Sequence, residues 1–171
     1  MSDARTASRG WVFGDDLDTD QILPGRYAPF MVGQERFHTY AFCDARPGFS
    51  SAVRPGDILV GGTNFGCGSS REYAVAALKK LGIGGVVATN FARIFYRNCI
   101  NLGIPAVESS DAFAVVRDGD AVRLDLAAGL LRAPAGDAQL RPLPAFAREI
   151  LAAGGVVAYL REHGDFPAVP A

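Results

Sequence analysis

The chain can be understood by working outward from one stretch, Asn64-Phe65-Gly66-Cys67-Gly68-Ser69-Ser70-Arg71-Glu72. A short apolar run, 58–60, stands before it and predicts a buried strand that ends at two glycines. After it, residues 72–81 place apolar side chains on one helical face, with lysines near the end and a glycine as a stop. The stretch is therefore expected to form a loop that joins the end of a strand to the start of a helix.

The same alternation continues toward the C-terminus. Runs 86–88 and 104–107 predict two further buried strands, and residues 91–101 between them predict a second helix. A β-α-β-α-β order implies right-handed crossovers and an α/β core. At the other end of the chain, residues 11–13 predict a short strand that ends at a turn.

The remaining segments are less regular. Residues 25–56 show no sustained period and predict a long loop. Residues 113–116 and 122–126 predict a hairpin, and residues 143–153 predict a final amphipathic helix. Because no linker or repeat interrupts the chain, we expect one domain over residues 1–171, with a frayed tail after about residue 164.

Composition excludes several classes of function. The hydrophobic content is 49%, the charged content is 20% and the formal net charge is -1, so nothing predicts nucleic acid or an anionic membrane as a partner. The apolar runs are too short to span a bilayer, and the first residues lack the apolar stretch of a signal peptide. Three widely spaced cysteines form no metal-binding framework and fit a reducing, cytoplasmic setting. We therefore expect no metal in this chain, and a required cluster would have to lie on another chain.

The loop before the helix has the features of a carboxylate site. In an open α/β sheet, ligands bind outside the carboxyl ends of the strands. Gly66 and Gly68 allow a ligand to approach the backbone, and the free N–H groups of the following helix favour an anion. Arg71 adds a guanidinium that can bind a carboxylate through two hydrogen bonds.

A purely structural interpretation competes with this one. Ser69 and Glu72 have the spacing of a capping box, in which the serine would be the N-cap and the glutamate would bond back to it. That pattern leaves the second serine, the glycines and Arg71 unexplained. The lysine and spacing of a phosphate-binding loop are absent.

Four motifs together resemble a known family. Residues 14–24 (Gly-Asp-Asp-Leu-Asp-Thr-Asp-Gln-Ile-Leu-Pro) resemble the opening motif of the small subunits of 3-isopropylmalate dehydratase, and residues 61–72 resemble the serine loop of that family. Residues 90–98 (Asn-Phe-Ala-Arg-Ile-Phe-Tyr-Arg-Asn) and the glycine pair 154–155 followed by Tyr159 and Leu160 resemble its later segments. The resemblance covers nearly the whole chain in order. It implies a single swivelling β/β/α domain with a mostly parallel central sheet, like the fourth domain of aconitases.

The resemblance also implies an activity and its partners. Enzymes of this family isomerise a hydroxy acid by removing water and adding it back. A large subunit carries a [4Fe–4S] cluster, and the small subunit supplies the base. By position in the motif Ser69 would be that base, and Ser70 and Arg71 would bind substrate. The residues expected to support them are Asp18, Thr19, Asp20, Gly66, Gly68 and Glu72.

Alternatives stand beside several of these assignments. Ser70 could be a buried structural hydroxyl, and Asp20 could either orient an active-site arginine or serve as a turn or cap residue. Arg93 and Arg97 lie four apart on the predicted helix, where surface or structural roles are favoured. Cys67 is interpreted as a small side chain packed in a tight turn. No basic neighbour in the sequence marks it as an activated thiol.

Specificity is assigned to the segment Tyr27-Ala28-Pro29-Phe30. Homoaconitase-type members resemble Tyr-Leu-Arg-Thr here, and their arginine can pair with an extra carboxylate. In this chain Pro29 takes the arginine's place, so a buried carboxylate would lack a cation, whereas an alkyl group would be accommodated. The expected substrate is an alkyl-substituted malate, first 2-isopropylmalate, converted to 3-isopropylmalate in leucine biosynthesis.

Other functions remain open at this point. A methyl-substituted malate such as 2,3-dimethylmalate or citramalate is the second choice of substrate, followed by a homoaconitase-type substrate. Outside catalysis, the chain could be a carboxylate-binding regulatory domain or an assembly partner of the cluster subunit. The sequence does not determine the stoichiometry with a large subunit or whether the isolated chain self-associates.

Overall fold

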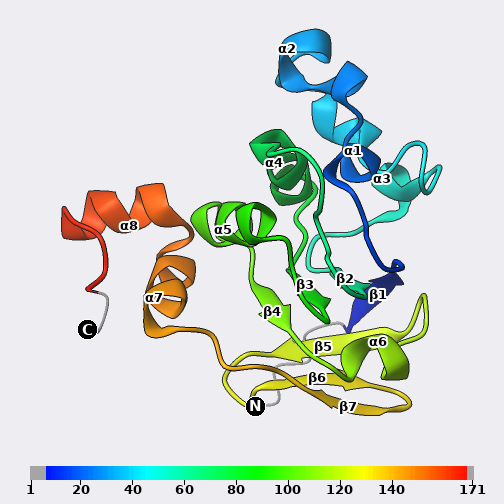
Figure 1. The fold of residues 1–171 in the computed structure, drawn as a ribbon, viewed down its shortest axis with the longest axis vertical. Coiled ribbons are helices and arrows are strands. Elements are labelled where there is room, and N and C mark those ends of the chain that lie inside the picture. The colour runs from blue at the N-terminus through cyan, green and yellow to red at the C-terminus, as the bar shows by residue number, and fades with distance from the viewer. Residues whose placement is uncertain (1–6, 169–171) are drawn as a thin grey trace.

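The computed structural model describes residues 7–168, which share one seven-stranded sheet with the strand order β4-β3-β2-β1-β5-β6-β7 (Figure 1). Strands β1 to β4 (Ser8–Val12, Ile58–Gly61, Gly85–Ala88 and Ala106–Glu108) run parallel to one another. The residues of β2 and β3 are buried throughout, because both faces of these strands are covered. The α/β class is thus confirmed, and four of the seven strands form the parallel part of the sheet.

The other part of the sheet is antiparallel. Strands β5 (Ala121–Asp125), β6 (Leu130–Ala133) and β7 (Gly136–Gln139) form a meander that pairs with the edge of β1. The predicted hairpin between residues 113–116 and 122–126 is wrong. Residues 112–115 form helix α6 (Ala112–Val115), and β5 pairs with β1 and β6. A short apolar run fits a buried helical turn as well as a strand, and here burial against the sheet decides.

Two helices cover one face of the parallel strands. Helix α4 (Glu72–Lys80) and helix α5 (Arg93–Asn101) begin and end close to the predicted boundaries. Alternate strand residues such as Leu59 and Val86 face these helices, whereas Val60 and Val87 face the cluster beneath α6 and the antiparallel strands. Both faces of the parallel strands therefore contribute to a hydrophobic core.

The expectation of a long loop over residues 25–56 is wrong. It contains two 3₁₀ turns (Gly25–Tyr27 and Phe37–Tyr40) and two one-turn helices, α2 (Pro29–Val32) and α3 (Phe49–Ala52). It follows helix α1 (Thr19–Ile22), and its aromatic side chains Phe37, Phe42 and Phe49 are buried in the main core. Elements of one turn carry too few residues to show a hydrophobic period, which is why the sequence pattern looked irregular.

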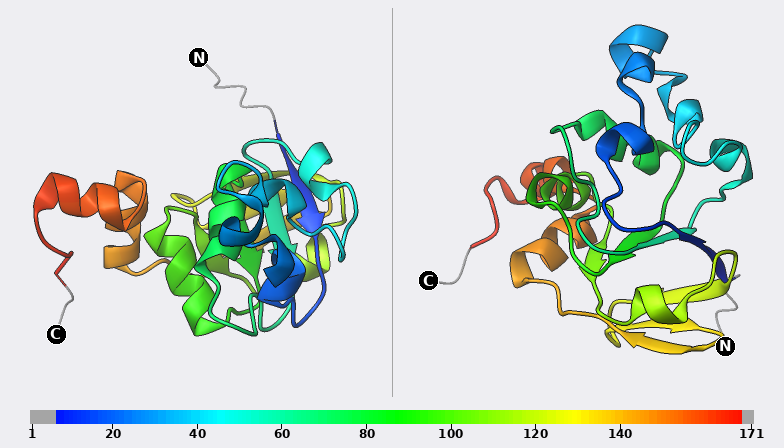
Figure 2. Two further views of the ribbon diagram at one scale, coloured as in Figure 1. Left: turned by 90° about the horizontal axis from the view of Figure 1, so that it is seen from above. Right: turned by 45° about the vertical axis from the view of Figure 1, so that its right-hand side comes forward.

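The C-terminal part forms a helical arm. Helix α7 (Ala145–Ala153) matches the predicted final helix and ends at Gly154 in a left-handed conformation. A second helix, α8 (Val156–His163), follows it and was not predicted. Figures 1 and 2 show α7 and α8 projecting to one side of the sheet, next to α5. Residues 165–168 carry no regular secondary structure, and the last three residues of the expected tail, 169–171, lie outside the described residues. None of the helices within residues 7–168 is long and apolar enough to cross a bilayer.

Candidate active site

The serine loop lies at the carboxyl ends of β2 and β3, where two other segments hold it. The backbone N–H of Gly66 donates to the Leu17 carbonyl at 2.8 Å, and that of Thr19 donates to the Cys67 carbonyl at 2.9 Å. The buried Thr19 hydroxyl donates to the Ser69 carbonyl at 2.9 Å. The motif at residues 14–24 therefore fixes the backbone of the loop from Gly66 to Ser69.

The loop before α5 holds it from the other side. The Asn64 N–H donates to Asn90 Oδ1 at 2.6 Å, and the Phe65 N–H donates to the Asn90 carbonyl at 3.1 Å. The Ala92 N–H donates back to the Phe65 carbonyl at 3.0 Å. Because β2 and β3 are parallel neighbours, the loops that follow them meet at one edge of the sheet.

The two glycines of the loop are required by its geometry. Gly66 and Gly68 have φ of +81° and +90°, a region that costs side-chain-bearing residues energy. A Cβ on Gly66 would stand 2.1 Å from Cγ of Phe95, and one on Gly68 would stand 2.4 Å from Oδ2 of Asp18. The supporting roles expected for these glycines thus have a steric basis in the loop's contacts.

The capping box expected at Ser69 is wrong. Arg71 is the N-cap residue of α4, and no side chain caps this helix. The capping box lies instead at α1, where Asp18 accepts from the backbone and Gln21 Oε1 accepts from the Asp18 N–H at 2.9 Å. Because the backbone is still extended at Arg71, Ser69 lies two residues before the N-cap position and cannot cap the helix.

Both serine hydroxyls are consequently available. Ser69 and Ser70 are exposed, so the alternative of a buried hydroxyl for Ser70 is wrong. Within residues 7–168, neither hydroxyl makes a hydrogen bond, and the same holds for the exposed carboxylate of Glu72.

Arg71 is held in place by Asp20. Nη1 of Arg71 contacts Oδ1 of Asp20 at 2.5 Å, and the same oxygen accepts from the Gly25 N–H at 3.0 Å. A Cβ on Gly25 would stand 2.9 Å from Arg71 Nη1, so the chain passes close to the guanidinium. Both roles weighed for Asp20, arginine partner and turn residue, are thus combined in one side chain.

A pocket of about 270 Å³ opens beside the loop and is lined by ten residues. From the serine-loop side come Ser69, Arg71, the two glycines and Thr19. The opposite wall is formed by the first turn of α5, including Arg93, and by Asn98. The pocket thus lies beside the starts of two helices, α4 through its N-cap residue Arg71 and α5 through its first turn.

Arg93 was not predicted as a site residue. The signal that identifies it is its place after β3, the strand next to β2, because the carboxyl ends of parallel neighbours lie at the same edge. Arg97, one turn further along α5, is exposed and does not line this pocket. Neither arginine forms an ion pair with a carboxylate within residues 7–168.

Cys67 has the environment of an inert thiol. Partial burial and the nearby carboxylates of Asp18 and Asp16 raise its pKa, so the thiolate is disfavoured. Burial likewise raises the pKa of Cys99 and of Cys43. The three cysteines are free, and residues 7–168 contain no group of three or more potential metal ligands.

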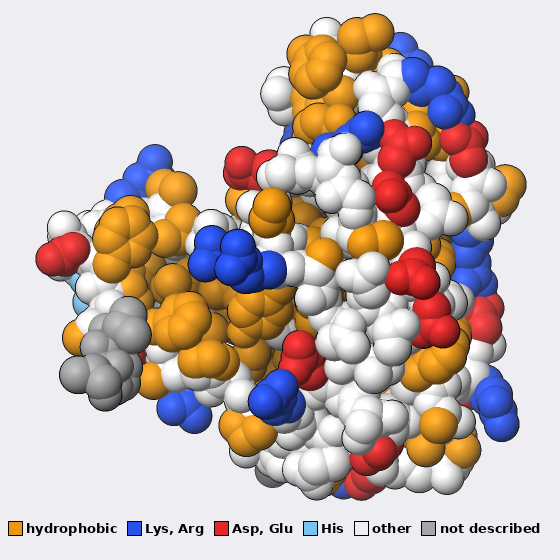
Figure 3. Space-filling model, in the orientation of Figure 1, with side chains coloured by type: hydrophobic (Ala, Val, Ile, Leu, Met, Phe, Trp, Pro, Cys, Tyr) orange, Lys and Arg blue, Asp and Glu red, His pale blue; other side chains and the backbone are white. Residues whose placement is uncertain are grey.

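The expected specificity segment divides into inward and outward parts. Tyr27 stacks on Tyr40 with ring centroids 4.1 Å apart, and Ala28 is fully buried. Pro29 begins α2, and Phe30 is 79% exposed. Hydrophobic side chains therefore cover the tip of α2 (Figure 3).

The tip of α2 is connected to the serine loop through one ring. The Phe30 ring lies 6.2 Å from that of Tyr73, and Arg71 Cζ lies 6.0 Å from the Tyr73 ring centroid. Tyr73 lies in the first turn of α4. The specificity segment does not line the pocket itself.

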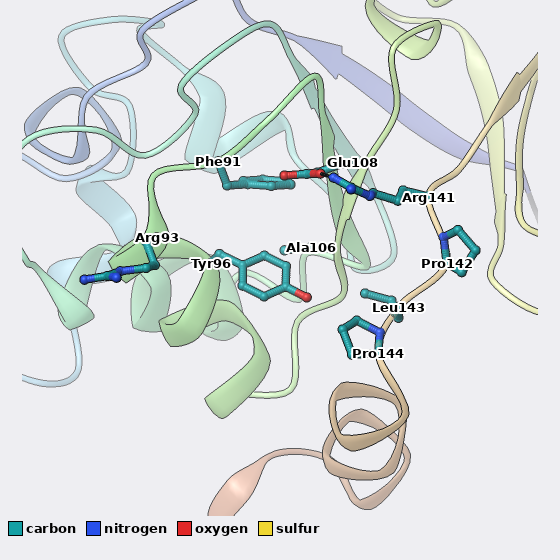
Figure 4. Close-up of a pocket in the computed structure, with 9 residues that line it drawn as sticks. All are labelled: Phe91, Arg93, Tyr96, Ala106, Glu108, Arg141, Pro142, Leu143 and Pro144. Carbon is teal, nitrogen blue, oxygen red and sulfur yellow. Dashed lines mark hydrogen bonds and ion pairs between the residues drawn. The ribbon is translucent and has the colours of Figure 1, made fainter. Parts of the chain in front are cut away.

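A larger pocket of about 430 Å³ lies on the other side of Arg93, between α5, β4 and residues 141–144 (Figure 4). Glu108 and Arg141 form an ion pair at 2.8 Å on its wall. In Figure 4 the Arg93 side chain extends away from this pair and from Tyr96. The larger pocket contains none of the expected site residues.

Comparison with known proteins identifies the class of this domain. Residues 22–112 match the family described as the Aconitase C-terminal domain, and the match spans more than half of the chain. The chain therefore belongs to the aconitase C-terminal domain family.

Curated relatives give a narrower assignment. The chain is 55% identical to "3-isopropylmalate dehydratase small subunit 1" of Deinococcus radiodurans, over 93% of this chain and 89% of that protein. It is 54% identical to "Homoaconitase small subunit" of Thermus thermophilus, over 93% and 98%. The crystal structure of a 3-isopropylmalate dehydratase from Methanocaldococcus jannaschii matches with a TM-score of 0.85 and 39% identity, over 93% and 95% of the two chains. Within its family the chain is a small subunit of the 3-isopropylmalate dehydratase type, and the enzymes of this type are hydro-lyases. A small subunit of this type implies a large-subunit partner.

Proposed function

We propose that this chain provides the proton-transfer and carboxylate-binding half of an enzyme that converts 2-isopropylmalate to 3-isopropylmalate. The observation that supports this most directly is the exposed Ser69 hydroxyl, which has no hydrogen-bond partner within residues 7–168 and lines one pocket with Arg71. The pocket is what distinguishes Ser69 from other exposed serines, because it places this hydroxyl in the same cavity as the Arg71 guanidinium, which can bind a substrate carboxylate.

Ser69 is the proposed base. Its Oγ takes the proton from the carbon next to a substrate carboxylate, and in the reverse half-reaction it returns that proton. A serine alkoxide needs strong electrostatic stabilisation, which the Arg71 guanidinium and the free N–H groups of the first turn of α5 can supply in a closed site. Arg71, oriented by Asp20, also binds a substrate carboxylate.

The other site residues have supporting roles in this proposal. The Ser70 hydroxyl hydrogen-bonds substrate in the closed complex, and Glu72 lies beside it at the start of α4. Thr19 anchors the backbone of Ser69, and the Asp18 carboxylate starts the helix that carries Asp20. Correct placement of the base therefore depends on the motif at residues 14–24.

The large subunit completes the site. We assign to it the [4Fe–4S] cluster, which would act as the Lewis acid for the departing hydroxyl group. The open pocket beside Ser69 fits a surface that closes only against another chain. We place the complex in the cytoplasm, where the free cysteines of this chain would stay reduced.

Two features favour an alkyl group on the substrate. The exposed tip of α2 offers the apolar side chains of Phe30 and Met31. The neighbouring cation, Arg26, is occupied by Asp44, with Nη2 at 2.6 Å from both carboxylate oxygens. A second candidate is the homoaconitase reaction, because a homoaconitase small subunit is almost as similar to this chain as the dehydratase subunit.

The test uses the complex with its large subunit. Ser69→Ala is expected to lower kcat by at least about a hundredfold with substrate binding largely retained, because it removes the base. Ser51→Ala, at another exposed serine, is the matched control and should keep full turnover. Full turnover in Ser69→Ala would instead support a regulatory or assembly role.

The substrate is tested separately with the wild-type complex. Isopropylmaleate and cis-homoaconitate are compared as substrates for hydration. A higher kcat/KM for isopropylmaleate is expected. The reverse preference would favour the homoaconitase reaction and leave the role of Ser69 unchanged.

A further inference from the structure

Arg93 lines the same pocket as the proposed base. It is the first residue of α5, and it lines the 270 Å³ pocket together with Ser69 and Arg71 of the serine loop. Its side chain is exposed and extends away from the Glu108–Arg141 pair (Figure 4). Its guanidinium is therefore available on the side of the pocket.

The balance of charge around the pocket distinguishes its two arginines. Arg71 is already paired with Asp20 at 2.5 Å. Arg93 contacts no carboxylate within residues 7–168, since Glu108, the acid that shares a pocket with it, is paired with Arg141 at 2.8 Å. A dicarboxylate brings two negative charges into a closing site, and each needs a cation or several hydrogen bonds to offset its desolvation. Within this chain, Arg71 can offset one of these two charges, and Arg93 is the other cation that lines the pocket.

A structural role for Arg93 has little support from its contacts. It makes no hydrogen bond or ion pair through its side chain within the described part of the chain. Arg97 on the same helix is equally exposed and unpaired, but it lines neither this pocket nor the larger one. Arg93 and Arg97 are thus alike in exposure and lack of partners, and they differ in that only Arg93 lines the pocket of Ser69.

We infer that Arg93 binds the second carboxylate of the hydroxy-dicarboxylate substrate, opposite the carboxylate held by Arg71. This inference rests on the proposed function, because it assigns a role within the same site. Residues of the first turn of α5 line the same pocket, and the positive end of the helix dipole adds to the attraction for an anion there. The pocket thereby selects dicarboxylates through two cations on opposite walls.

The test compares Arg93→Ala with Arg97→Ala in the assembled two-subunit enzyme. Arg93→Ala is expected to raise KM for 3-isopropylmalate on the order of ten- to a hundredfold, with a smaller change in kcat, because a charge-assisted bond to bound substrate is lost. Arg93→Lys should recover part of the loss, and Arg97→Ala should behave as wild type. An unchanged KM in Arg93→Ala would overturn the inference.

A second measurement separates substrate binding from assembly. The inhibitor 2-hydroxy-4-methylpentanoate is 3-isopropylmalate without the carboxyl group on C3, and its inhibition constant is compared with the KM values. If Arg93 holds that carboxylate, Arg93→Ala leaves this inhibition constant almost unchanged. An equal loss for both compounds, or weakened assembly with the large subunit and no change in KM, would refute the assignment.

The outcome for Arg93 is distinguishable from that for Ser69. If Ser69→Ala abolishes turnover while Arg93→Ala leaves KM unchanged, the proposed function stands and only the second carboxylate site is wrong. If Ser69→Ala retains turnover, the proposed function itself fails.

Discussion

Replacing Gly66 with alanine tests whether the serine loop is built around a steric requirement. The residue has φ +81°, and an added Cβ would stand 2.1 Å from Cγ and 2.5 Å from Cβ of Phe95. Phe95 is 2% exposed and its ring packs against Phe65 at 5.5 Å, so it has little room to move. The substitution therefore forces the loop away from α5.

The expected cost has two parts. A left-handed conformation costs a residue with a side chain about 1–2 kcal/mol. Overpacking a close-packed contact adds about 1–3 kcal/mol. An alanine at Gly48 measures the conformational cost without the overpacking cost, because the φ of Gly48 is +84° and nothing lies within 4 Å of an added Cβ. Gly48→Ala should lose about 1–2 kcal/mol from the free energy of unfolding, and Gly66→Ala roughly 2–5 kcal/mol.

The assay is urea unfolding of both variants and of the wild-type chain, followed by circular dichroism. Gly66→Ala should also lower kcat of the assembled enzyme, since Ser69 lies three residues further along the displaced loop. Equal losses of stability in the two variants would show that the contact with Phe95 is relaxed at no cost, and the steric argument would be refuted.

Three further predictions follow from contacts within the described residues. Asp20→Asn is expected to lower kcat/KM about tenfold, because it weakens the ion pair that orients Arg71. It should cost little stability, since the pair is partly exposed, and steady-state kinetics with a thermal-unfolding control would check both expectations. The hydrogen bond from Arg46 holds the pKa of Asp118 in the folded protein below its usual value. The pair therefore stabilises the fold fully at pH above the unfolded carboxyl pKa of about 4, and this stabilisation is lost as the pH falls through the lower pKa of the folded state. The difference in stability between wild type and Asp118→Ala should therefore shrink on acidification, and a difference that is constant with pH would contradict this. Phe30→Ala should leave the free energy of unfolding within about 0.5 kcal/mol of wild type, since the ring is 79% exposed, yet reduce kcat/KM for the alkyl substrate; a large loss of stability would place the ring in the core instead.

The local signals that proved correct are those with strong periodicity or several coincident markers. The helices at 72–80 and 93–101 and the parallel strand between them follow from apolar spacing, lysines and glycine stops. The interpretation of Cys67 as an unactivated thiol stays a prediction, with which the raised pKa of this partly buried thiol agrees. Residues 25–56 were misjudged because each of their elements is a single turn, stabilised by buried aromatic rings and not by a local pattern.

The capping assignment shows why spacing alone is insufficient. Ser69 and Glu72 have the separation of a capping box, but the backbone is still extended at Arg71, so α4 starts after that residue and Ser69 lies two positions before the N-cap. The same motif type at Asp18 does form, because Asp18 is itself the N-cap residue of α1. Backbone conformation decided between two equally good sequence matches.

The sequence by itself determined the alternation of strands and helices, the loop that carries Ser69 and Arg71, and the family to which the motifs point. These depend on interactions between residues close along the chain, which leave a pattern in the sequence. The tertiary structure decided that Asp20 would hold Arg71 and that Arg93 would lie across the pocket from Ser69. Those relations join residues about twenty to fifty positions apart, through the parallel pairing of β2 with β3 and the hydrogen bonds of residues 14–24, and no local pattern encodes them.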